Sequence, residues 1–223
     1  MRDYKSKNTS KSWKPYFKTF FMAFTLAVCF FGFSQNTSKN ILQAKGISEI
    51  IVDGYQIFNI SVIASDTDKI IVSSITDGEY QNDFKVVSEV KGNQLFLKLE
   101  RTALHQTPDD KRNAHKVVAA TVTLELPENL KLSIKSDIGS VAAKGNFFEL
   151  KLNLEQGGCY IEGFVRFATI ETVDGNIFVK TNNAIIETDS RHGLVNFPND
   201  IMGFNVWRLK TYSGNITVKK LEQ

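Results

Sequence analysis

Residues that build metal sites and disulfide frameworks are scarce in this sequence. Among its 223 residues there are two cysteines and three histidines. Because Cys29 lies in a segment interpreted below as a leader, Cys159 is the only cysteine of the exported chain and cannot form an internal disulfide. No two of the histidines have the spacing of metal ligands, and His105 and His115 flank a polar stretch typical of a solvated loop. His192 precedes a turn glycine, so we expect it to be an exposed turn residue. We therefore predict no metal site and no cofactor.

Long apolar runs are also rare, and the main one is too short to span a bilayer comfortably. It extends over residues 20–33. Gly32 and Ser34 place small residues at minus three and minus one of a cleavage site before Gln35, which is typical of a secretory leader. The run follows six basic residues, namely Arg2, Lys5, Lys7, Lys11, Lys14 and Lys18. We therefore predict a signal peptide at 1–34 and an extracytoplasmic protein, in the periplasm, on the outer surface or in the medium.

The surroundings of Cys29 do not favour a lipid anchor. Residues 26–28 distantly resemble the lipobox of bacterial lipoproteins, but Val28 is a poor fit. Phe30 and Phe31 follow directly, where a lipidated chain normally starts with polar residues. We expect neither a lipid anchor nor a transmembrane anchor once the leader has been removed.

The positive net charge of the whole sequence is lost when the leader is removed. The whole sequence has 27 basic and 24 acidic residues, and the leader takes six basic residues and one acidic residue with it. The remaining 21 basic and 23 acidic residues give the exported chain a slightly negative net charge. We therefore expect no nucleic-acid partner.

Between Lys131 and Lys220 a short pattern of alternating apolar residues occurs five times, each time around a turn glycine. The glycines are separated by 18, 18, 18 and 21 residues, and they are Gly139, Gly157, Gly175, Gly193 and Gly214. We refer to the five copies as repeats 1 to 5. A period near twenty residues with strand-like alternation predicts a parallel β-helix, or β-solenoid, of about five regular coils. A meander of antiparallel hairpins is the alternative, because Asp174-Gly175 and Ser213-Gly214 also suit hairpin turns.

Each repeat has apolar residues at the same four positions relative to its glycine, and Thr188 alone departs from this pattern. Two and four residues after the glycine stand Val141, Cys159, Ile177, Val195 and Ile216, then Ala143, Ile161, Val179, Phe197 and Val218. Five and seven residues before it stand Ile134, Leu152, Ile170, Thr188 and Leu209, then Leu132, Leu150, Ala168, Ile186 and Trp207. We expect these columns to form the core, with Cys159 as an inert buried thiol. The glycines are expected to bend the chain between two strands, where a residue that tolerates positive φ is favoured.

Residues 43–126 precede the repeats and are also strand-like, but with irregular spacing, and no long amphipathic helix is present. The strand-like runs are Glu49 to Val52, Ile57 to Ala64, Lys69 to Ile75, Phe84 to Val90, Gln94 to Leu99 and Val117 to Leu126. We predict an irregular β-rich section that continues into the repeats and caps them, within a single all-β domain at 35–223 whose residues 131–220 are the repeat coils. At the other end, the charged side chains of Lys219, Lys220 and Glu222 are expected to discourage edge-to-edge strand pairing.

The outward acidic residues of the repeats do not form a pair of catalytic carboxylates. Glu171 and Asp189 share an outward column with Lys135, Asn153 and Lys210. A column of mixed sign is typical of a solvated face rather than of the paired carboxylates of a glycosidase. We therefore predict no catalytic residues and a protein that is not an enzyme.

The outward residues beside the core columns include one group of matched aromatic and charged side chains. If the repeats stack in register, Tyr160 and Phe178 are neighbours about 4.8 Å apart, next to an alternating ladder formed by Lys144, Glu162 and Lys180. One interpretation is that these cross-strand pairs only stabilise the sheet, by roughly 0.2–1 kcal/mol each. The other is a flat platform for a sugar ring or a partner protein. We take these five residues as the candidate ligand-binding site, with a cell-surface glycan or an envelope protein as its partner.

Two segments around the turn glycines carry a resemblance to a known family. They are Thr172-Val173-Asp174-Gly175-Asn176-Ile177 and Thr211-Tyr212-Ser213-Gly214-Asn215-Ile216. Together with the leader and the irregular β-rich first half, they resemble the bacterial envelope proteins named putative adhesins, a family of unknown function. The resemblance covers most of the exported chain. It implies a right-handed parallel β-helix without established chemistry, and it offers no catalytic residues to carry over.

Three classes of function fit these features. We favour an exported non-enzymatic β-solenoid that acts as an interaction or adhesion surface in the bacterial cell envelope, because the columns hold no convergent polar groups. A polysaccharide-processing enzyme is an alternative, since β-helices host lyases and glycosidases, although five short coils make a small cleft wall. A self-assembling structural element is another, since open solenoids can stack through their terminal coils.

Overall fold

The computed structural model describes four stretches of the chain, residues 36–77, 84–101, 119–198 and 200–222. The expected leader, with Cys29, and the polar segment that contains His105 and His115 lie outside them. Within the described stretches the chain consists of strands and turns, and it contains no helix that is long and apolar enough to cross a membrane. The prediction of an all-β fold is confirmed. Residues Gln35–Gln223 form one compact unit.

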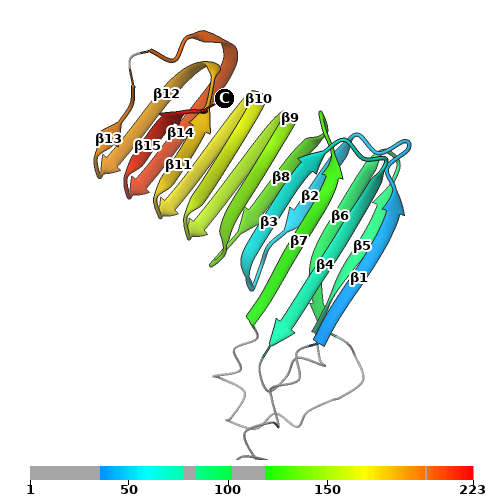
Figure 1. Ribbon diagram of the computed structural model, residues 1–223. Coiled ribbons are helices and arrows are strands. Elements are labelled where there is room, and N and C mark those ends of the chain that lie inside the picture. Colours follow the sequence, from blue (N-terminus) through cyan, green and yellow to red (C-terminus); the bar gives the residue numbers. More distant parts are fainter. Residues whose placement is uncertain (1–35, 78–83, 102–118, 199, 223) are drawn as a thin grey trace, which may run out of the picture. The chain divides into compact units, whose positions relative to one another are not determined.

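Fifteen strands make up most of the described chain (Figure 1). Those before the repeats are β1 (Asn36–Gln43), β2 (Glu49–Asp53), β3 (Ile57–Ser65), β4 (Lys69–Asp77), β5 (Phe84–Lys91), β6 (Gln94–Arg101) and β7 (Ala119–Pro127). Those of the repeats are β8 (Lys131–Ser136), β9 (Ser140–Gln156), β10 (Cys159–Asp174), β11 (Ile177–Thr181), β12 (Asn183–His192), β13 (Val195–Asn196), β14 (Gly203–Ser213) and β15 (Ile216–Lys220).

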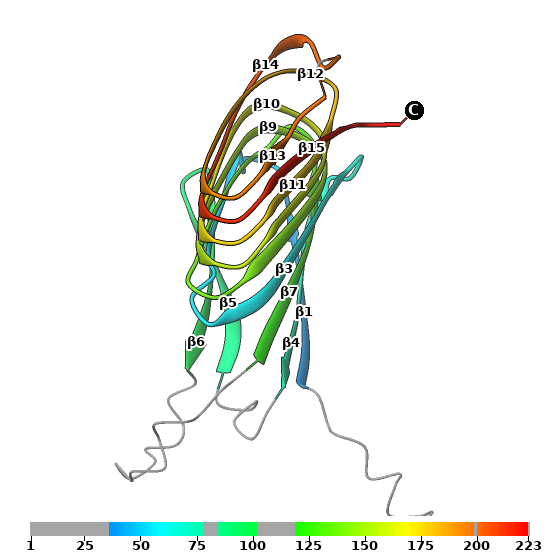
Figure 2. The same ribbon diagram turned by 90° about the vertical axis from the view of Figure 1, so that its left-hand side faces the viewer.

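All these strands belong to one sheet, in which the long strands β9 and β10 join two parallel series. The first halves of β9 and β10 pair with β3 and β11, and their second halves pair with β8 and β14. We call ladder A the series β7-β3-β9-β10-β11-β15-β13 and ladder B the series β6-β2-β8-β9-β10-β14-β12. Every neighbouring pair within either ladder is parallel, and the strands of the repeats lie over one another in Figure 2. The alternative of an antiparallel meander is therefore excluded for the repeats.

Antiparallel strands extend both ladders beyond β6 and β7. β4 pairs with β7 and β1 pairs with β4 next to ladder A, and β5 pairs with β6 next to ladder B. The six strand-like runs expected in residues 43–126 correspond to strands, and β1 is an additional strand that the sequence pattern did not indicate. Despite their irregular spacing, β2 and β3 stack in parallel directly on the strands of repeat 1.

The repeats do not stack in the order in which they occur in the chain. β14 lies between β10 and β12, and β15 lies between β11 and β13, so repeat 5 is inserted between repeats 3 and 4 (Figure 1). The expectation that Lys219, Lys220 and Glu222 lie at the end of the stack is therefore wrong, because β12 and β13 form that end. Repeat 4 is the copy whose apolar columns are interrupted, by Thr188. Placing it at the end exposes the residues that contribute least to the core.

Burial of the core columns follows this spatial order. In repeats 1, 2, 3 and 5 every column residue is buried, and the most exposed of them, Cys159, is only 3% exposed. In repeat 4, Val195 is 44% exposed, and Ile186, Thr188 and Phe197 are only partly buried. The predicted core columns are thus confirmed for four repeats and wrong for Val195. The reason is that a residue of the end repeat has a neighbouring strand on one side only.

Close approach of neighbouring backbones holds the ladders in register at two columns of small residues. At each turn glycine of repeats 2 to 5, an added Cβ would overlap the backbone carbonyl oxygen of the turn glycine in a neighbouring repeat. The glycine that would carry the Cβ and the glycine that supplies the carbonyl are, in turn, Gly157 and Gly139, Gly175 and Gly157, Gly214 and Gly175, and Gly193 and Gly214. At the opposite corner, Gly145 meets the carbonyl of Ala64, and Gly163 meets that of Gly145. Positive φ, the reason expected from the sequence, applies to only two of the five turn glycines, Gly157 at 121° and Gly214 at 151°. The neighbouring strand is therefore the main reason for glycine at these turns.

Hydroxyl groups reinforce the column of turn glycines. Three residues before the glycine, the hydroxyls of Ser136, Thr172, Ser190 and Thr211 donate hydrogen bonds of 2.8–3.2 Å to the carbonyls of Gly54, Gly157, Gly214 and Gly175, respectively. Three of these bonds tie a repeat to its neighbour, and the bond from Ser136 ties repeat 1 to the turn between β2 and β3. Each of them satisfies a carbonyl at a turn. A second tie lies between the ladders, where the fully buried Trp207 donates its Nε1–H to the carbonyl of Val165 at 2.9 Å.

Replacing Gly175 by alanine should lower the free energy of unfolding by about 3 kcal/mol, because the new Cβ would overlap the backbone carbonyl of Gly157. Gly158→Ala is the matched control, since its Cβ would lie 3.3 Å from the carbonyl oxygen of Asn176 and should lower that free energy by less than about 1 kcal/mol. Urea unfolding followed by circular dichroism gives both values. Equal destabilisation by the two variants would show that close approach does not maintain the register.

Inserting cysteines at register positions should reveal the order of the repeats. Lys180 and Lys219 are register partners on β11 and β15, so the pair Lys180→Cys and Lys219→Cys should form a disulfide under mild oxidation. The pair Lys180→Cys and Pro198→Cys would be neighbours if the repeats stacked in chain order, and it should stay reduced. Peptide mass spectrometry without reduction distinguishes the two. A disulfide in the second pair but not in the first would contradict the insertion of repeat 5.

Candidate functional site

The five candidate binding residues lie together on the outward side of ladder A, and we call them the aromatic–charge patch. Lys144 comes from β9, Tyr160 and Glu162 from β10, and Phe178 and Lys180 from β11. Tyr160 pairs with Phe178, and Glu162 pairs with both lysines, as the register predicted. The next strand in space is β15 of repeat 5, so the row continues with a lysine, residue 219, and not with the proline of repeat 4.

The two aromatic rings of the patch stack on each other. The ring centroids of Tyr160 and Phe178 are 5.2 Å apart, and the ring planes differ by 4°. The ammonium groups of Lys180 and Lys219 lie over the Phe178 ring, at 5.9 and 5.5 Å from its centroid. Tyr160 is 38% exposed, whereas Phe178 is partly buried. One face of each ring is therefore covered by the other ring, and Tyr160 offers most of the open aromatic surface.

Glu162 connects the charged residues of the patch. Its carboxylate lies 2.8 Å from Lys144 Nζ and 3.8 Å from Lys180 Nζ, and it accepts a hydrogen bond of 2.7 Å from the Tyr160 hydroxyl. The hydrogen bond from Lys144, and next the one from Tyr160, lowers the pKa of Glu162. Glu162 in turn raises the pKa of Lys144 through the same hydrogen bond. The carboxylate is thus held in its ionised form and is not suited to donate a proton as a general acid.

Cys159 lies behind this surface, in the core column. It is 3% exposed, and burial raises the pKa of its thiol to about 12. A thiol that stays protonated is a poor nucleophile, which agrees with the inert role expected from the column. Within the described stretches, no three residues of the types His, Cys, Asp or Glu lie close enough to hold a metal ion together.

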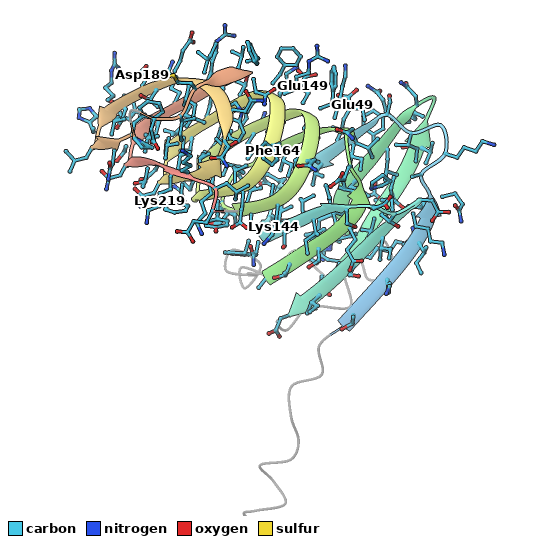
Figure 3. The ribbon with its side chains drawn as sticks, turned by 45° about the horizontal axis from the view of Figure 1, so that its top comes forward. Glu49, Lys144, Glu149, Phe164, Asp189 and Lys219 are labelled. Carbon is cyan, nitrogen blue, oxygen red and sulfur yellow. The ribbon has the colours of Figure 1, made fainter. Side chains whose placement is uncertain are left out.

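The outward side of ladder B lies on the opposite side of the unit. Figure 3 shows Glu49, Glu149 and Asp189 on this side, whereas Lys144 and Lys219 point away on the side of ladder A. The two ladders therefore present two separate surfaces. A partner that contacts the aromatic–charge patch leaves the outward side of ladder B free.

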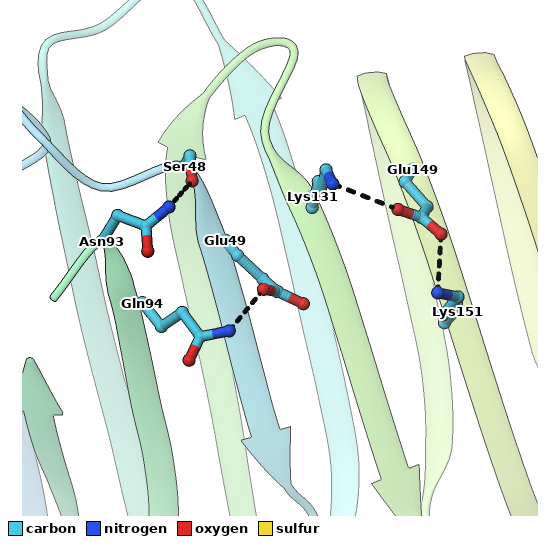
Figure 4. Close-up of polar contacts among 7 residues, drawn as sticks. All are labelled: Ser48, Glu49, Asn93, Gln94, Lys131, Glu149 and Lys151. Atoms are coloured by element: carbon cyan, nitrogen blue, oxygen red, sulfur yellow. Dashed lines mark hydrogen bonds and ion pairs between the residues drawn. The ribbon is translucent and has the colours of Figure 1, made fainter. Parts of the chain in front are cut away.

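Near the start of its strands, ladder B carries paired polar side chains (Figure 4). The carboxylate of Glu149 lies 3.7 Å from Lys131 Nζ and 2.7 Å from Lys151 Nζ. The hydrogen bond from Lys151 is the main reason that the pKa of Glu149 is lowered. On the neighbouring strands β2 and β6, Gln94 Nε2 donates a hydrogen bond of 2.6 Å to Glu49 Oε2. These contacts resemble those around Glu162 and stabilise neighbouring strands.

Further along the same strands the outward side of ladder B is hollowed. One hollow of about 250 Å³ lies over β8, β9, β10 and β14, and a second of about 550 Å³ lies over β2, β8 and β9. Lys135 and Glu155 line both, so the hollows adjoin. We call them together the ladder-B groove, and its outward residues include Tyr55, Lys135, Glu155, Glu171, Lys210 and Tyr212. The short side chain of Asn153, between Lys135 and Glu171 in the register, keeps the floor of the first hollow low.

Three residues of this groove were noted from the sequence and were interpreted as part of a solvated face. Lys135, Glu171 and Lys210 share one outward row, as expected, and Lys210 separates Glu171 from Asp189. Tyr212 was not identified as a candidate, although its position two residues before a turn glycine places it in an outward column. Tyr55 lies outside the repeats, so the repeat register offered no signal for it.

Tyr212 is held by side chains of the end strand β12. The His192 ring meets it edge-on, with centroids 5.1 Å apart and planes at 70°, and the Arg191 guanidinium lies 5.5 Å from its centroid. His192 is exposed, as expected, but it ends the strand β12 and does not lie in the turn itself. Both residues come from repeat 4, whose strand β12 pairs with β14 of repeat 5.

The fold resembles that of a known bacterial protein. No family model matches the sequence, and no curated protein matches it. The crystal structure of a putative cell adhesion protein from Clostridium sporogenes covers 84% of this chain and 100% of its own, with a TM-score of 0.56 and 14% identity. That of a putative adhesin from Bacteroides fragilis covers 84% and 98%, with a TM-score of 0.38 and 14% identity. The first likeness shows a shared fold, and the name of that protein agrees with the family of putative adhesins that the sequence motifs resemble.

Lys144→Met should raise the pKa of the Glu162 carboxyl toward its ordinary value, because the hydrogen bond from Lys144 is the main cause of its depression. Lys180→Met is the control and should raise it less, since Lys180 acts only through its charge. Because the folded-state pKa lies below the unfolded one, the carboxylate stabilises the fold above its unfolded pKa, and this contribution is lost as the pH falls through the folded pKa. Carboxyl ¹³C NMR titration measures the shifts, and equal shifts in the two variants would contradict the assignment.

Proposed function

We propose that this chain is an exported, non-enzymatic β-solenoid that acts as an interaction or adhesion surface in the bacterial cell envelope. The observation that carries the proposal is the register of ladders A and B, which sets the outward side chains of successive strands in rows on two opposite surfaces. A stack of this kind is a rigid scaffold whose partner can be contacted by several repeats at once.

The solenoid interpretation rests on the path of the chain. Each repeat contributes one strand to ladder B and the next strand to ladder A, with its turn glycine between the two. At Gly145 and Gly163 the strands β9 and β10 pass from ladder A back to ladder B. Five repeats thus correspond to five coils, stacked in the order 1, 2, 3, 5 and 4, with β2 and β3 as a further coil before them.

The non-enzymatic part of the proposal is supported by the state of the polar groups on the surface. Glu162 and Glu149 are neutralised by lysines that lower the pKa of each carboxyl, so neither is suited to protonate a leaving group at neutral pH. Cys159 is buried with a raised pKa. These three groups are therefore better suited to stability than to catalysis.

The envelope location is supported by the leader-like first 34 residues and by the fold shared with the Clostridium sporogenes protein. A glycan or a protein of the cell envelope is the proposed partner of the aromatic–charge patch. Tyr160 supplies an open aromatic surface there, and Lys144 and Lys180 supply hydrogen-bond donors beside it. Amphipathic aromatics beside charged groups are enriched where proteins bind partners.

The double variant Tyr160→Ala and Phe178→Ala should weaken binding of the purified protein to isolated cell envelopes of the producing bacterium by at least about tenfold, since it removes the aromatic contact area of the patch. Co-sedimentation with the envelopes measures the binding. The control, Phe164→Ala with Phe167→Ala, removes two exposed aromatics outside the patch and should bind like the unmodified protein. Unchanged binding by the patch variant, with the fold intact by circular dichroism, would refute the role of the patch.

A self-assembling structural element is the second candidate, favoured by exposed apolar residues of repeats 4 and 5. Among the described residues, the three most exposed large apolar side chains are Leu194, Met202 and Phe204, which lie between the end of β12 and the start of β14. Within the described stretches, β12 pairs with β14 alone. Opposing this, β12 carries Glu187 and Asp189 on its outward side, and charges on an edge strand disfavour pairing with another chain. Sedimentation velocity separates the candidates, because an assembling chain sediments faster as its concentration rises.

A further inference from the structure

The ladder-B groove differs from the rest of the same surface in the state of its charges. Nearer the start of the strands, Glu149 is held between two lysines, and Glu187 accepts a hydrogen bond of 3.2 Å from an arginine. In the groove, Lys135, Glu171 and Lys210 have no ion-pair partner among the described residues. Glu171 and Lys210 remain unpaired even though they are register partners on adjacent strands. Their hydrogen-bonding capacity is therefore available to a ligand.

Tyrosines line the two hollows at opposite ends of the groove. Tyr55, in the turn between β2 and β3, is 61% exposed, and Tyr212, on β14, is 49% exposed. Tyr212 is held in place by Arg191 and His192, so its ring is oriented before any ligand arrives. Exposed and oriented tyrosines are the side chains that carry much of the contact area in binding sites.

The dimensions of the groove suit an extended ligand. It crosses β2, β8, β9, β10 and β14, which are successive strands of ladder B. At about 4.8 Å between strands, it extends over roughly 19 Å. The larger hollow, of about 550 Å³, is within the range of roughly 300–1,000 Å³ found for small-molecule sites.

We propose that the ladder-B groove binds a neutral linear oligosaccharide of about four sugar units, which lies across the strands with a ring against each tyrosine. Sugar hydroxyls both donate and accept hydrogen bonds. The carboxylates of Glu155 and Glu171 accept from them, and the ammonium groups of Lys135 and Lys210 donate to them. The apolar C–H face of a sugar ring packs on the face of Tyr55 or Tyr212.

Charge and backbone geometry exclude two other ligand classes. The groove is lined by four carboxylates, those of Asp53, Asp137, Glu155 and Glu171, and by two ammonium groups, so it repels polyanionic chains. An extended peptide that adds a strand needs an unpaired strand edge. The floor of the groove consists of β2, β8, β9, β10 and β14, each of which is paired on both sides.

This inference deepens the proposed interaction role, on which it rests, and it assigns a ligand class to a surface opposite the aromatic–charge patch. The two proposals fail separately. Loss of envelope binding in the patch variant without oligosaccharide binding in the groove would support the first and overturn the second. Oligosaccharide binding in the groove with no envelope binding would do the reverse.

The test titrates the purified ¹⁵N-labelled protein with cellotetraose, mannotetraose and chitotetraose, and with a tetragalacturonate as the polyanionic control. At least one neutral tetrasaccharide should shift backbone amide signals of β8, β9, β10 and β14 around the groove, and the polyanion should shift none of them. Tyr212→Ala and, separately, Lys210→Met should each weaken that binding by about tenfold or more. Tyr160→Ala with Phe178→Ala is the matched control and should leave it unchanged.

Three results would overturn the proposal. One is the absence of amide shifts with all three neutral tetrasaccharides, and another is shifts confined to ladder A. The third is unchanged affinity in both Lys210→Met and Tyr212→Ala, each with the circular dichroism spectrum of the unmodified protein. Because the unmodified protein is mapped directly, a variant that fails to fold does not remove the test.

Discussion

The structure depends on the close approach of successive backbones at its corners. At the turn glycines, and at Gly145 and Gly163, the carbonyl of one strand pair occupies the space that a Cβ of the next would fill. Only one alignment of neighbouring strands brings glycine to carbonyl at every level, so these contacts set the register of both ladders together. The hydroxyls that bond to the same carbonyls, such as that of Thr211, strengthen this alignment. The same register keeps the apolar columns buried, because a shift of one strand by one residue would turn its apolar side chains outward.

A fixed register also organises the surface. Because like positions lie side by side, Tyr160 stacks on Phe178 and Glu162 comes between two lysines, and both arrangements stabilise the sheet that presents them. The same rule produces the ladder-B groove, where a short residue, Asn153, lies between longer ones. The two proposed binding surfaces therefore arise from differences in side-chain length and pairing along a row and not from separate loops.

The ends of a stacked sheet are under a different constraint from its middle. An end strand pair is covered on one side only, so its side chains cannot all be buried and its edge stays unpaired. Repeat 4, with Thr188 in a core column, takes this place, and repeat 5, with Trp207 and Leu209, lies inside. Insertion of the last repeat thus places the more apolar copy where both of its sides are covered. On the end strand β12, Arg191 and His192 lie against Tyr212 of the neighbouring strand β14.

The all-β class, the turn glycines, most of the core columns and the pairing of Tyr160 with Phe178 could be predicted from the sequence alone, because alternation with a constant period specifies which residues share a face and a level. The order of the repeats and the adjoining hollows over Tyr55 and Tyr212 are seen only in the folded protein. Order depends on which copy is best buried on both sides, and that is a comparison among whole repeats which a periodic pattern does not contain. The hollows depend on side chains from strands that are distant in the chain, so their shape exists only once the strands are stacked.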